Sequence, residues 1–169
     1  MTYTKQQVIQ TFLKVLEELN KPDVTNLSLE ERKKLTENPN TPSETLAILA
    51  RDKKWNVRCG VAANPNTSPE TLALLAKDDT SNIRKYVAKN LNAPPETLTR
   101  LASDKNSYVR FNVSQNPNTT PEALIILAED KVSYVRWSTE TITLTKQQKE
   151  AIQNLIDSSQ DENLKSIKL

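Results

Sequence analysis

The sequence predicts an all-α solenoid built from four helical repeats, and three observations support this fold class. A block that begins with Asn recurs every 26 residues, at Asn38, Asn64, Asn90 and Asn116. Each block carries apolar residues at helical spacing, without the alternation typical of a strand. A unit this short cannot bury its own apolar face and must stack on its neighbours, as in other chains with periods of about 20–50 residues.

Each block opens with a turn and a helix start. Asn-Pro-Asn opens three of the blocks, combining a side chain that bonds nearby backbone with a ring that fixes φ. The spacing of a capping box, in which hydroxyl and carboxylate satisfy backbone N–H groups, occurs in Thr41 with Glu44, Thr67 with Glu70, and Thr119 with Glu122. The third block has Ala93 instead of Thr, so the N-terminus of its first helix is expected to be less stable.

Two short amphipathic helices are expected in each block. The first carries a Leu, Leu-Ala stripe: Leu46/Leu49/Ala50, Leu72/Leu75/Ala76, Leu98/Leu101/Ala102 and Leu124/Leu127/Ala128. Each stripe stops at an Asp: Asp52, Asp78, Asp104 and Asp130. The second helix carries core residues four apart: Val57 and Val61, Ile83 and Val87, Val109 and Val113, Val135 and Thr139.

Both flanks of the repeats are expected to be caps. The predicted parts are an N-terminal helical cap over 1–37, four repeats over 38–141, and a C-terminal capping helix with a polar tail over 142–169. Arg32 lies 26 residues before Arg58, so residues 28–37 are interpreted as a degenerate half-repeat. Terminal repeats need capping segments with a polar outer face to stay soluble.

Helix starts and apolar faces are visible in both caps. Thr4 precedes an amphipathic segment, and Ser28 with Glu31 has the spacing of a capping box. Thr145 and Gln148 open the last helix. The two apolar faces comprise Val8, Phe12, Leu16 and Leu19 in the first cap, and Ala151, Ile152, Leu155 and Ile156 in the last.

These residues resemble the leucine-rich repeat variant family, whose units run Asn-Pro-Asn-Thr-Pro, Leu, Leu-Ala, Asp and Val-Arg in that order. The resemblance covers residues 38–141, where turn, cap, stripe and Val-Arg recur in register. It implies a right-handed superhelix of alternating α- and 3₁₀-helices, related to the HEAT and armadillo solenoids. Some members bind an iron–sulphur centre through an N-terminal cysteine cluster. This chain lacks that cluster, so no cofactor is carried over.

Composition favours a soluble, cytoplasmic protein with an aliphatic core. Aromatic residues make up 5% of the chain, and the formal net charge is +2, from 23 basic and 21 acidic residues. That balance does not favour nucleic acid as a partner. Cys59 is the only cysteine, which excludes an internal disulfide. No apolar run reaches the roughly 20 residues of a membrane span, and no secretory signal is visible.

The sequence predicts that the chain is not an enzyme and holds no metal. It has no His, which removes imidazole bases and the common zinc sets. Gly60 is the only glycine, so a glycine-rich phosphate loop is excluded. The carboxylates recur in every unit, which indicates a structural role. Cys59 is interpreted as a small core residue and not as a reactive thiol.

An Arg follows the core position of each second helix, at Arg58, Arg84, Arg110 and Arg136. One interpretation is a cationic row that contacts phosphate or an acidic partner. The favoured one pairs each Arg with the Asp six residues earlier, or with the counterpart of that Asp one unit away. Exposed pairs of this kind contribute only about 0–1 kcal/mol each, so their expected role is orientation.

The units differ most at two positions of the second helix, three residues apart on one face. They hold Asn56 and Cys59, Asn82 and Lys85, Tyr108 and Phe111, then Tyr134 and Trp137. Stacking should place the four aromatic side chains in one cluster, which is the predicted partner surface together with Asn82 and Lys85. Alternatively, the helix from Thr145 folds back and covers the cluster, with Tyr134 and Trp137 the more covered.

The leading hypothesis is a non-enzymatic scaffold or assembly subunit that binds another protein along the repeat surface. The alternative is a HEAT-like solenoid that binds nucleic acid, with phosphate contacts from Arg84, Lys85, Lys89 and Lys54 and stacking by Tyr86 or Tyr108. Near-neutral charge disfavours the alternative. The sequence leaves the partner's identity and the oligomeric state open.

Overall fold

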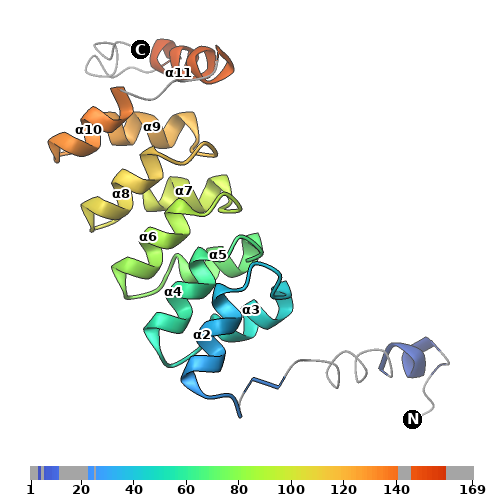
Figure 1. Ribbon diagram of the computed structural model, residues 1–169. Coiled ribbons are helices and arrows are strands. Elements are labelled where there is room, and N and C mark those ends of the chain that lie inside the picture. Colours follow the sequence, from blue (N-terminus) through green and yellow to red (C-terminus); the bar gives the residue numbers. More distant parts are fainter. Residues whose placement is uncertain (1–3, 5, 12–22, 25, 141–145, 159–169) are drawn as a thin grey trace.

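Helices account for all the regular secondary structure in the residues that the structure describes. The computed structural model describes residues 4, 6–11, 23–24, 26–140 and 146–158, with side-chain burial omitted at 140 and 146–149. Within these residues no strand occurs, and the helices follow one another as an elongated stack (Figure 1). The prediction of an all-α solenoid is confirmed.

The helices come in pairs, one pair per repeat. A single helix, α2 (Leu29–Glu37), precedes the pairs. The pairs are α3 (Ser43–Leu49) with α4 (Trp55–Ala63), α5 (Pro69–Leu75) with α6 (Ser81–Lys89), α7 (Pro95–Leu101) with α8 (Ser107–Ser114), and α9 (Pro121–Ala128) with α10 (Ser133–Glu140). The last helix is α11 (Lys146–Ser158). Residues 6–11 are also helical.

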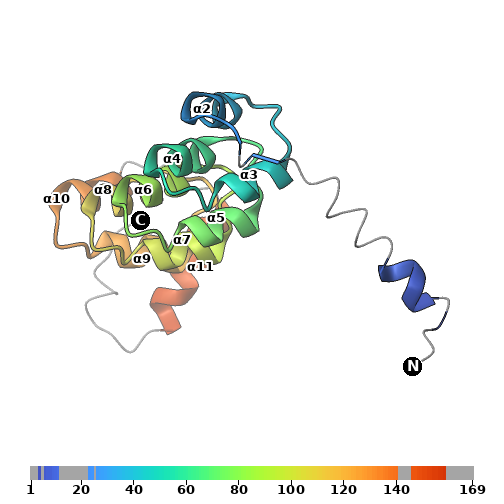
Figure 2. The ribbon, with the colours of Figure 1, turned by 90° about the horizontal axis from the view of Figure 1, so that it is seen from below.

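Two layers of helices run along the stack. The second helices α4, α6, α8 and α10 pack closely, each against the next, whereas neighbouring first helices lie farther apart. In the view down the stack, the two layers form separate rows (Figure 2). Helix α2 packs on α4 as α4 packs on α6, so residues 28–37 extend the second-helix layer as a half-repeat.

The core consists of the apolar residues that recur with both the 26-residue repeat and the helical period. Leu46, Leu72 and Leu98 of the first helices are fully buried, as are Val57 and Ile83 of the second helices. Helices α4, α6 and α8 contribute both of their predicted core residues, which lie between the layers. The exceptions are Ala128 and Thr139 in the last unit, which are half-buried. The core is one continuous aliphatic row along the stack.

The first helices begin one residue later than the capping-box spacing predicts. The N-caps are Ser68 in α5 and Thr120 in α9, each of which accepts a bond from a backbone N–H. In α5, α7 and α9 a proline follows the N-cap at the first helical position, and this fixes the start. The capping boxes predicted at Thr41, Thr67 and Thr119 were therefore wrong.

Those three threonines have another role. Each is buried, and its hydroxyl donates to the carbonyl oxygen six residues earlier: Thr41 to Leu35, Thr67 to Val61, Thr119 to Val113. Ala93 lacks this bond because it has no hydroxyl. Its helix α7 has no side-chain cap, but neither does α3, so the expectation that the third unit alone begins weakly was wrong.

Both helices of every unit are α-helical, in contrast to the alternation with 3₁₀-helices that the resemblance implies. Tighter i→i−3 bonds occur at the ends of first helices, as from the Asp52 N–H to the Leu49 carbonyl. Four-residue bonds such as Ala50 N–H to Leu46 carbonyl precede them. A first helix of seven residues therefore completes α-helical turns before tightening at its last turn.

The C-terminal helix covers part of the last unit. Ile152 and Ile156 of α11 are buried against Leu124, with Ile125 beside them. In the N-terminal segment, Thr4 and Gln7 bond reciprocally at a helix start, and Val8 is 55% exposed. Phe12, Leu16, Leu19 and Thr145 lie outside the described residues. None of the described helices combines the length and the hydrophobicity needed to cross a membrane.

Candidate binding surface

At each junction between complete units, an arginine donates hydrogen bonds both to its own unit and to the next unit. Arg84 donates from Nε and Nη2 to the Asp104 carboxylate, at 2.6 and 2.9 Å, and from Nη1 to the Asp78 carbonyl oxygen at 2.7 Å. The same contacts recur for Arg58 with Asp78 and for Arg110 with Asp130. The carboxylate thus comes from the next unit, and the Asp six residues earlier supplies its carbonyl.

The half-repeat carries the first member of this series. Arg32 Nε lies 2.7 Å from Asp52 Oδ2, an ion pair whose angle does not make a hydrogen bond. Arg84 and Arg110 are each 5% exposed. The hydrogen bond from Arg110 lowers the pKa of Asp130 in spite of its burial. These guanidinium groups join units to one another and do not form a solvent-exposed cationic row.

A second repeating contact was not predicted from the sequence. The Asn90 side-chain amide is buried and donates to the carbonyl oxygens of Ala62 and Asn64, at 3.0 and 2.9 Å. Asn64 and Asn116 make the same pair of bonds one unit earlier and later. Their Oδ1 atoms accept the backbone N–H two residues on, as expected for a turn. The recurrence of Asn every 26 residues is visible in the sequence, but we interpreted it only as a sign of a local turn.

Three of the four predicted aromatic side chains form a cluster across α8 and α10. The Tyr134 ring lies 5.9 Å from both the Tyr108 and the Phe111 rings, edge-on to Phe111. The Tyr134 hydroxyl donates to Ser107 Oγ at 2.7 Å, which fixes its orientation. Tyr108 is 64% exposed, and Phe111 is half-buried against the core. Trp137 is 63% exposed and makes no ring contact with the other described aromatic side chains.

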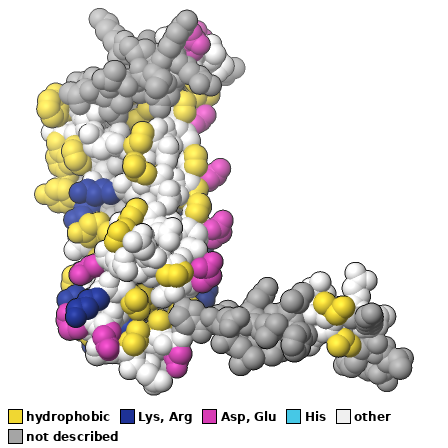
Figure 3. All heavy atoms as spheres, turned by 45° about the vertical axis from the view of Figure 1, so that its right-hand side comes forward, with side chains coloured by type: hydrophobic (Ala, Val, Ile, Leu, Met, Phe, Trp, Pro, Cys, Tyr) yellow, Lys and Arg dark blue, Asp and Glu magenta, His cyan; other side chains and the backbone are white. Residues whose placement is uncertain are grey.

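The C-terminal helix does not cover this cluster. Helix α11 packs mainly on α9, in the first-helix layer, and the view down the stack places it away from α10. The expectation that Tyr134 and Trp137 are the more covered was therefore wrong for Trp137, while Tyr134 is 37% exposed. Figure 3 shows hydrophobic side chains gathered along one edge of the upper stack, with Lys and Arg side chains beside them.

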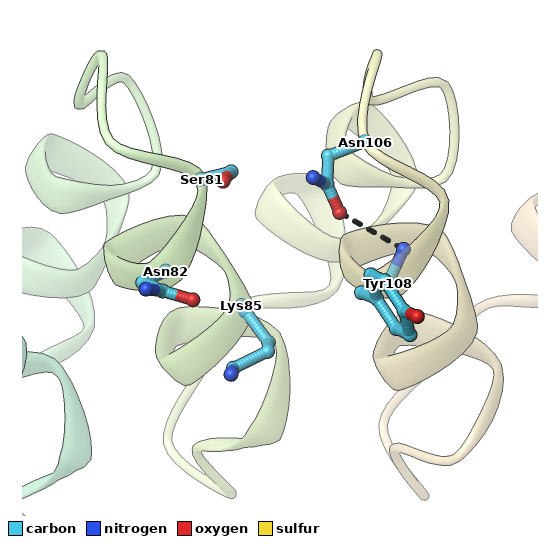
Figure 4. A pocket seen from close by; sticks show the side chains of 5 residues that line it. All are labelled: Ser81, Asn82, Lys85, Asn106 and Tyr108. Carbon is cyan, nitrogen blue, oxygen red and sulfur yellow. Dashed lines mark hydrogen bonds between the residues drawn. The ribbon is translucent and has the colours of Figure 1, made fainter.

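A hollow adjoins the cluster between α6 and α8. Its volume is about 260 Å³, and it is lined by Ser81, Asn82, Lys85, Asn106 and Tyr108 (Figure 4). At the next junction the equivalent positions hold Tyr108, Phe111 and Tyr134, whose rings meet. Here the smaller Asn82 and the flexible Lys85 leave the space open. The structure thus brings five of the six predicted site residues, all but Trp137, into one continuous surface.

The hollow presents hydrogen-bond donors and no carboxylate. Asn106 accepts from the Tyr108 N–H with its Oδ1 atom, so its amide group is directed away from α8 (Figure 4). The Lys85 ammonium, which lies 5.3 Å from the centre of the Tyr86 ring, is not paired with a carboxylate of the described residues. A hollow with these linings suits a carboxylate or another hydrogen-bond acceptor beside an aromatic surface.

No metal-binding group accompanies this surface in the described part of the chain. Among the described residues, no three Asp, Glu or Cys side chains are grouped as a metal site requires. Cys59 is buried, and its burial raises the pKa of the thiol, which keeps it protonated. The arrangement offers shape, aromatic rings and donors, which are the features of a binding surface.

One segment of the chain is similar to a known repeat family. The sequence model of the leucine rich repeat variant family matches residues 55–79, which include α4 and α5. Over these residues the chain is similar to a leucine rich repeat variant. The match crosses the junction at Asn64, so this variant unit comprises the second helix of one block and the first helix of the next. No curated protein and no solved structure matches the chain.

Proposed function

We propose that this chain is a non-enzymatic scaffold that binds a partner protein on the second-helix face, across α6, α8 and α10. The observation that carries the proposal is the exposed Tyr108–Phe111–Tyr134 cluster, continuous with the donor-lined hollow at Lys85. Energetically important contacts of protein interfaces concentrate in such aromatic groups, surrounded by polar residues.

The side chains of this surface are held in place before any partner arrives. Tyr134 is fixed by its ring contacts and by the bond to Ser107. The backbone at Tyr108 is fixed by Asn106, whose side chain caps α8. Fixed aromatic side chains lose little conformational entropy on binding, so more of the contact energy appears as affinity.

Nucleic acid is the less supported partner. Arg84, one of the cations that this alternative needs, is buried and paired with Asp104 and is not available to phosphate. Tyr86 is half-buried and packs against the core, which restricts it as a stacking platform. Lys54, Lys85 and Lys89 remain as cations, and three lysines provide few phosphate contacts.

The test compares matched exposed aromatic residues. Tyr108→Ala and Lys85→Glu alter the proposed surface, whereas Trp55→Ala removes an exposed ring of α4 that lies outside the cluster. Partners captured by the wild type are identified by mass spectrometry, and their affinity for each variant is measured by calorimetry. We expect at least about a tenfold loss for both surface variants and none for Trp55→Ala. Equal affinity for all three variants contradicts the proposal.

A salt titration separates the two partner classes. Binding to single- or double-stranded DNA or RNA must weaken steeply with salt because counterions are released. Binding of a protein to an aromatic cluster should depend on salt only weakly. Nucleic-acid binding that Lys85→Glu abolishes and Tyr108→Ala weakens would replace the scaffold proposal with its alternative.

A further inference from the structure

Every internal junction of the second-helix layer pairs an arginine with an aspartate of the next unit, and the last junction adds an aromatic contact. At the junction of α8 and α10, Arg110 holds the Asp130 carboxylate and Phe111 contacts the Tyr134 ring. Asp130 lies in the loop that leads into α10, and Tyr134, four residues later, lies in the first turn of that helix. The last unit is therefore bound by its predecessor through one carboxylate and one aromatic ring.

On α10 the residues equivalent to Arg110 and Phe111 are Arg136 and Trp137. Arg136 keeps the bond from Nη1 to the Asp130 carbonyl oxygen, as the other arginines do. Its carboxylate is missing, since the residue 20 positions later is Ile156, which is buried in the contact of α11 with α9. Among the residues whose side chains the structure describes, no carboxylate forms an ion pair with Arg136, whereas Arg58, Arg84 and Arg110 each have one.

Helix α11 does not pack closely on α10, the helix that carries this pair. Because α11 packs mainly on α9, it extends the first-helix layer and not the second (Figures 1 and 2). Trp137 is 63% exposed, whereas its equivalent Phe111 is half-buried by the unit that follows. Among the described residues, no helix therefore continues the second-helix layer beyond α10.

We propose that the Arg136–Trp137 face binds an acidic segment of a partner protein, with a carboxylate four residues ahead of an aromatic side chain at the start of a helix. Charge complementarity selects this occupant, because the guanidinium is already oriented by Asp130 and matches a carboxylate bidentately. The face is separate from the hollow at Lys85, so the proposal does not depend on that site.

A second copy of this chain does not offer the required group. The position 26 residues before Asp52 is Asn26, whose amide carries no charge. The first unit of another copy therefore lacks the carboxylate that α10 would receive. A partner with Asp or Glu at that position supplies it.

The probe is a peptide that copies residues 121–136, acetylated and amidated, because it contains Asp130 and Tyr134 and no tryptophan. The full chain carries Trp55→Phe, so its emission reports Trp137 alone. We expect a saturable shift of that emission, with affinity at least about tenfold weaker for the Asp130→Asn peptide and for an Arg136→Gln chain. An unchanged emission at millimolar peptide, or equal affinity for the Asn peptide, overturns the proposal.

Thermal unfolding of the peptide-free chain provides the second measurement. Arg136→Gln should lower the melting temperature by less than about 2 °C, whereas Arg110→Gln should lower it by several times more. Equal decreases would mean that the Arg136 face is already filled, which overturns the proposal. Sedimentation that detects dimers dependent on Arg136 would overturn the choice of occupant in favour of a second copy.

Discussion

Thr36 of α2 packs directly on the backbone of Gly60 in α4. A Cβ atom at position 60 would lie 2.0 Å from Thr36 Oγ1 and 2.7 Å from Thr36 Cβ. The Thr36 hydroxyl donates to the Lys33 carbonyl oxygen, which fixes its rotamer. The only glycine of the chain therefore permits the half-repeat to approach the first complete unit.

Gly60→Ala should destabilise the protein by about 1–3 kcal/mol, although alanine favours a helix by about 1 kcal/mol over glycine. The added methyl group forces α2 and α4 apart, since the closest Thr36 atoms belong to a stiff β-branched side chain. Urea unfolding measures the change. Thr36→Ala in the same chain should restore part of the loss, and a net gain in stability from Gly60→Ala alone would contradict the interpretation.

Asn90→Ala should cost on the order of 3 kcal/mol, because it leaves two buried carbonyl groups and one backbone N–H without their partner. Asn38→Ala is the matched control: Asn38 is exposed, and its side chain bonds only the Asn40 N–H among the described residues. Its expected cost is below about 1 kcal/mol. Similar costs for the two variants, measured by chemical denaturation, would show that the interunit bonds contribute little.

Leu75 and Leu74 are neighbours in α5 that differ in burial, with exposed fractions of 2% and 41%. Leu75→Ala empties a core position in a middle unit and should cost about 2–5 kcal/mol. Leu74→Ala removes a largely solvated side chain and should cost less than about 1 kcal/mol. Calorimetric melting of both variants measures the difference, and it should be absent if the stack is loosely packed.

The arginine–aspartate contacts should make stability fall in acid. Burial acts to raise the pKa of Asp104, but the hydrogen bonds from Arg84 and from the Asn106 N–H prevail and lower it. The pKa of Asp78 and that of Asp130 are lowered as well. A lowered folded-state pKa gives stability that is complete above the unfolded value and is lost as the pH falls below about 4 toward the folded value.

Urea midpoints measured between neutral pH and pH 2.5 test this expectation. Asp104→Asn should be less stable than the wild type at pH 7, and its stability should fall less on acidification because one titrating carboxylate is gone. A wild-type midpoint that stays constant across this range would show that the three carboxylates contribute nothing.

The regular part of the fold could be predicted because its signals are periodic. Leu72 and Val87 lie at positions where a 26-residue period and a helical period coincide, and both are fully buried. The pairing of Arg84 with an aspartate was predicted too, but two candidates were left open. Choosing between Asp78 and Asp104 requires knowing how far one unit is displaced from the next, and a single unit's sequence does not contain that displacement.

The remaining errors have the same physical origin. Thr67 was assigned to a helix cap because its spacing to Glu70 is local, whereas its bond to Val61 depends on how the turn folds back on α4. The aromatic cluster could be predicted from equivalent positions of stacked units. The exposure of the cluster could not be predicted, because the amphipathic pattern of α11 is compatible with packing on either layer. In the structure α11 contacts Leu124 and therefore extends the first-helix layer.

The contacts at each junction repeat with one spacing, so whole units are interchangeable. Removing residues 64–89 would place Asp104 20 positions after Arg58, where Asp78 now stands, and Asn90 where Asn64 now stands. Losing 25 residues instead would shift the register by one residue, a turn of about 100° within a helix, and break the contacts at that junction. A chain of this kind can thus become longer or shorter in steps of 26 residues, with each step changing the reach of its surface and leaving the joints intact.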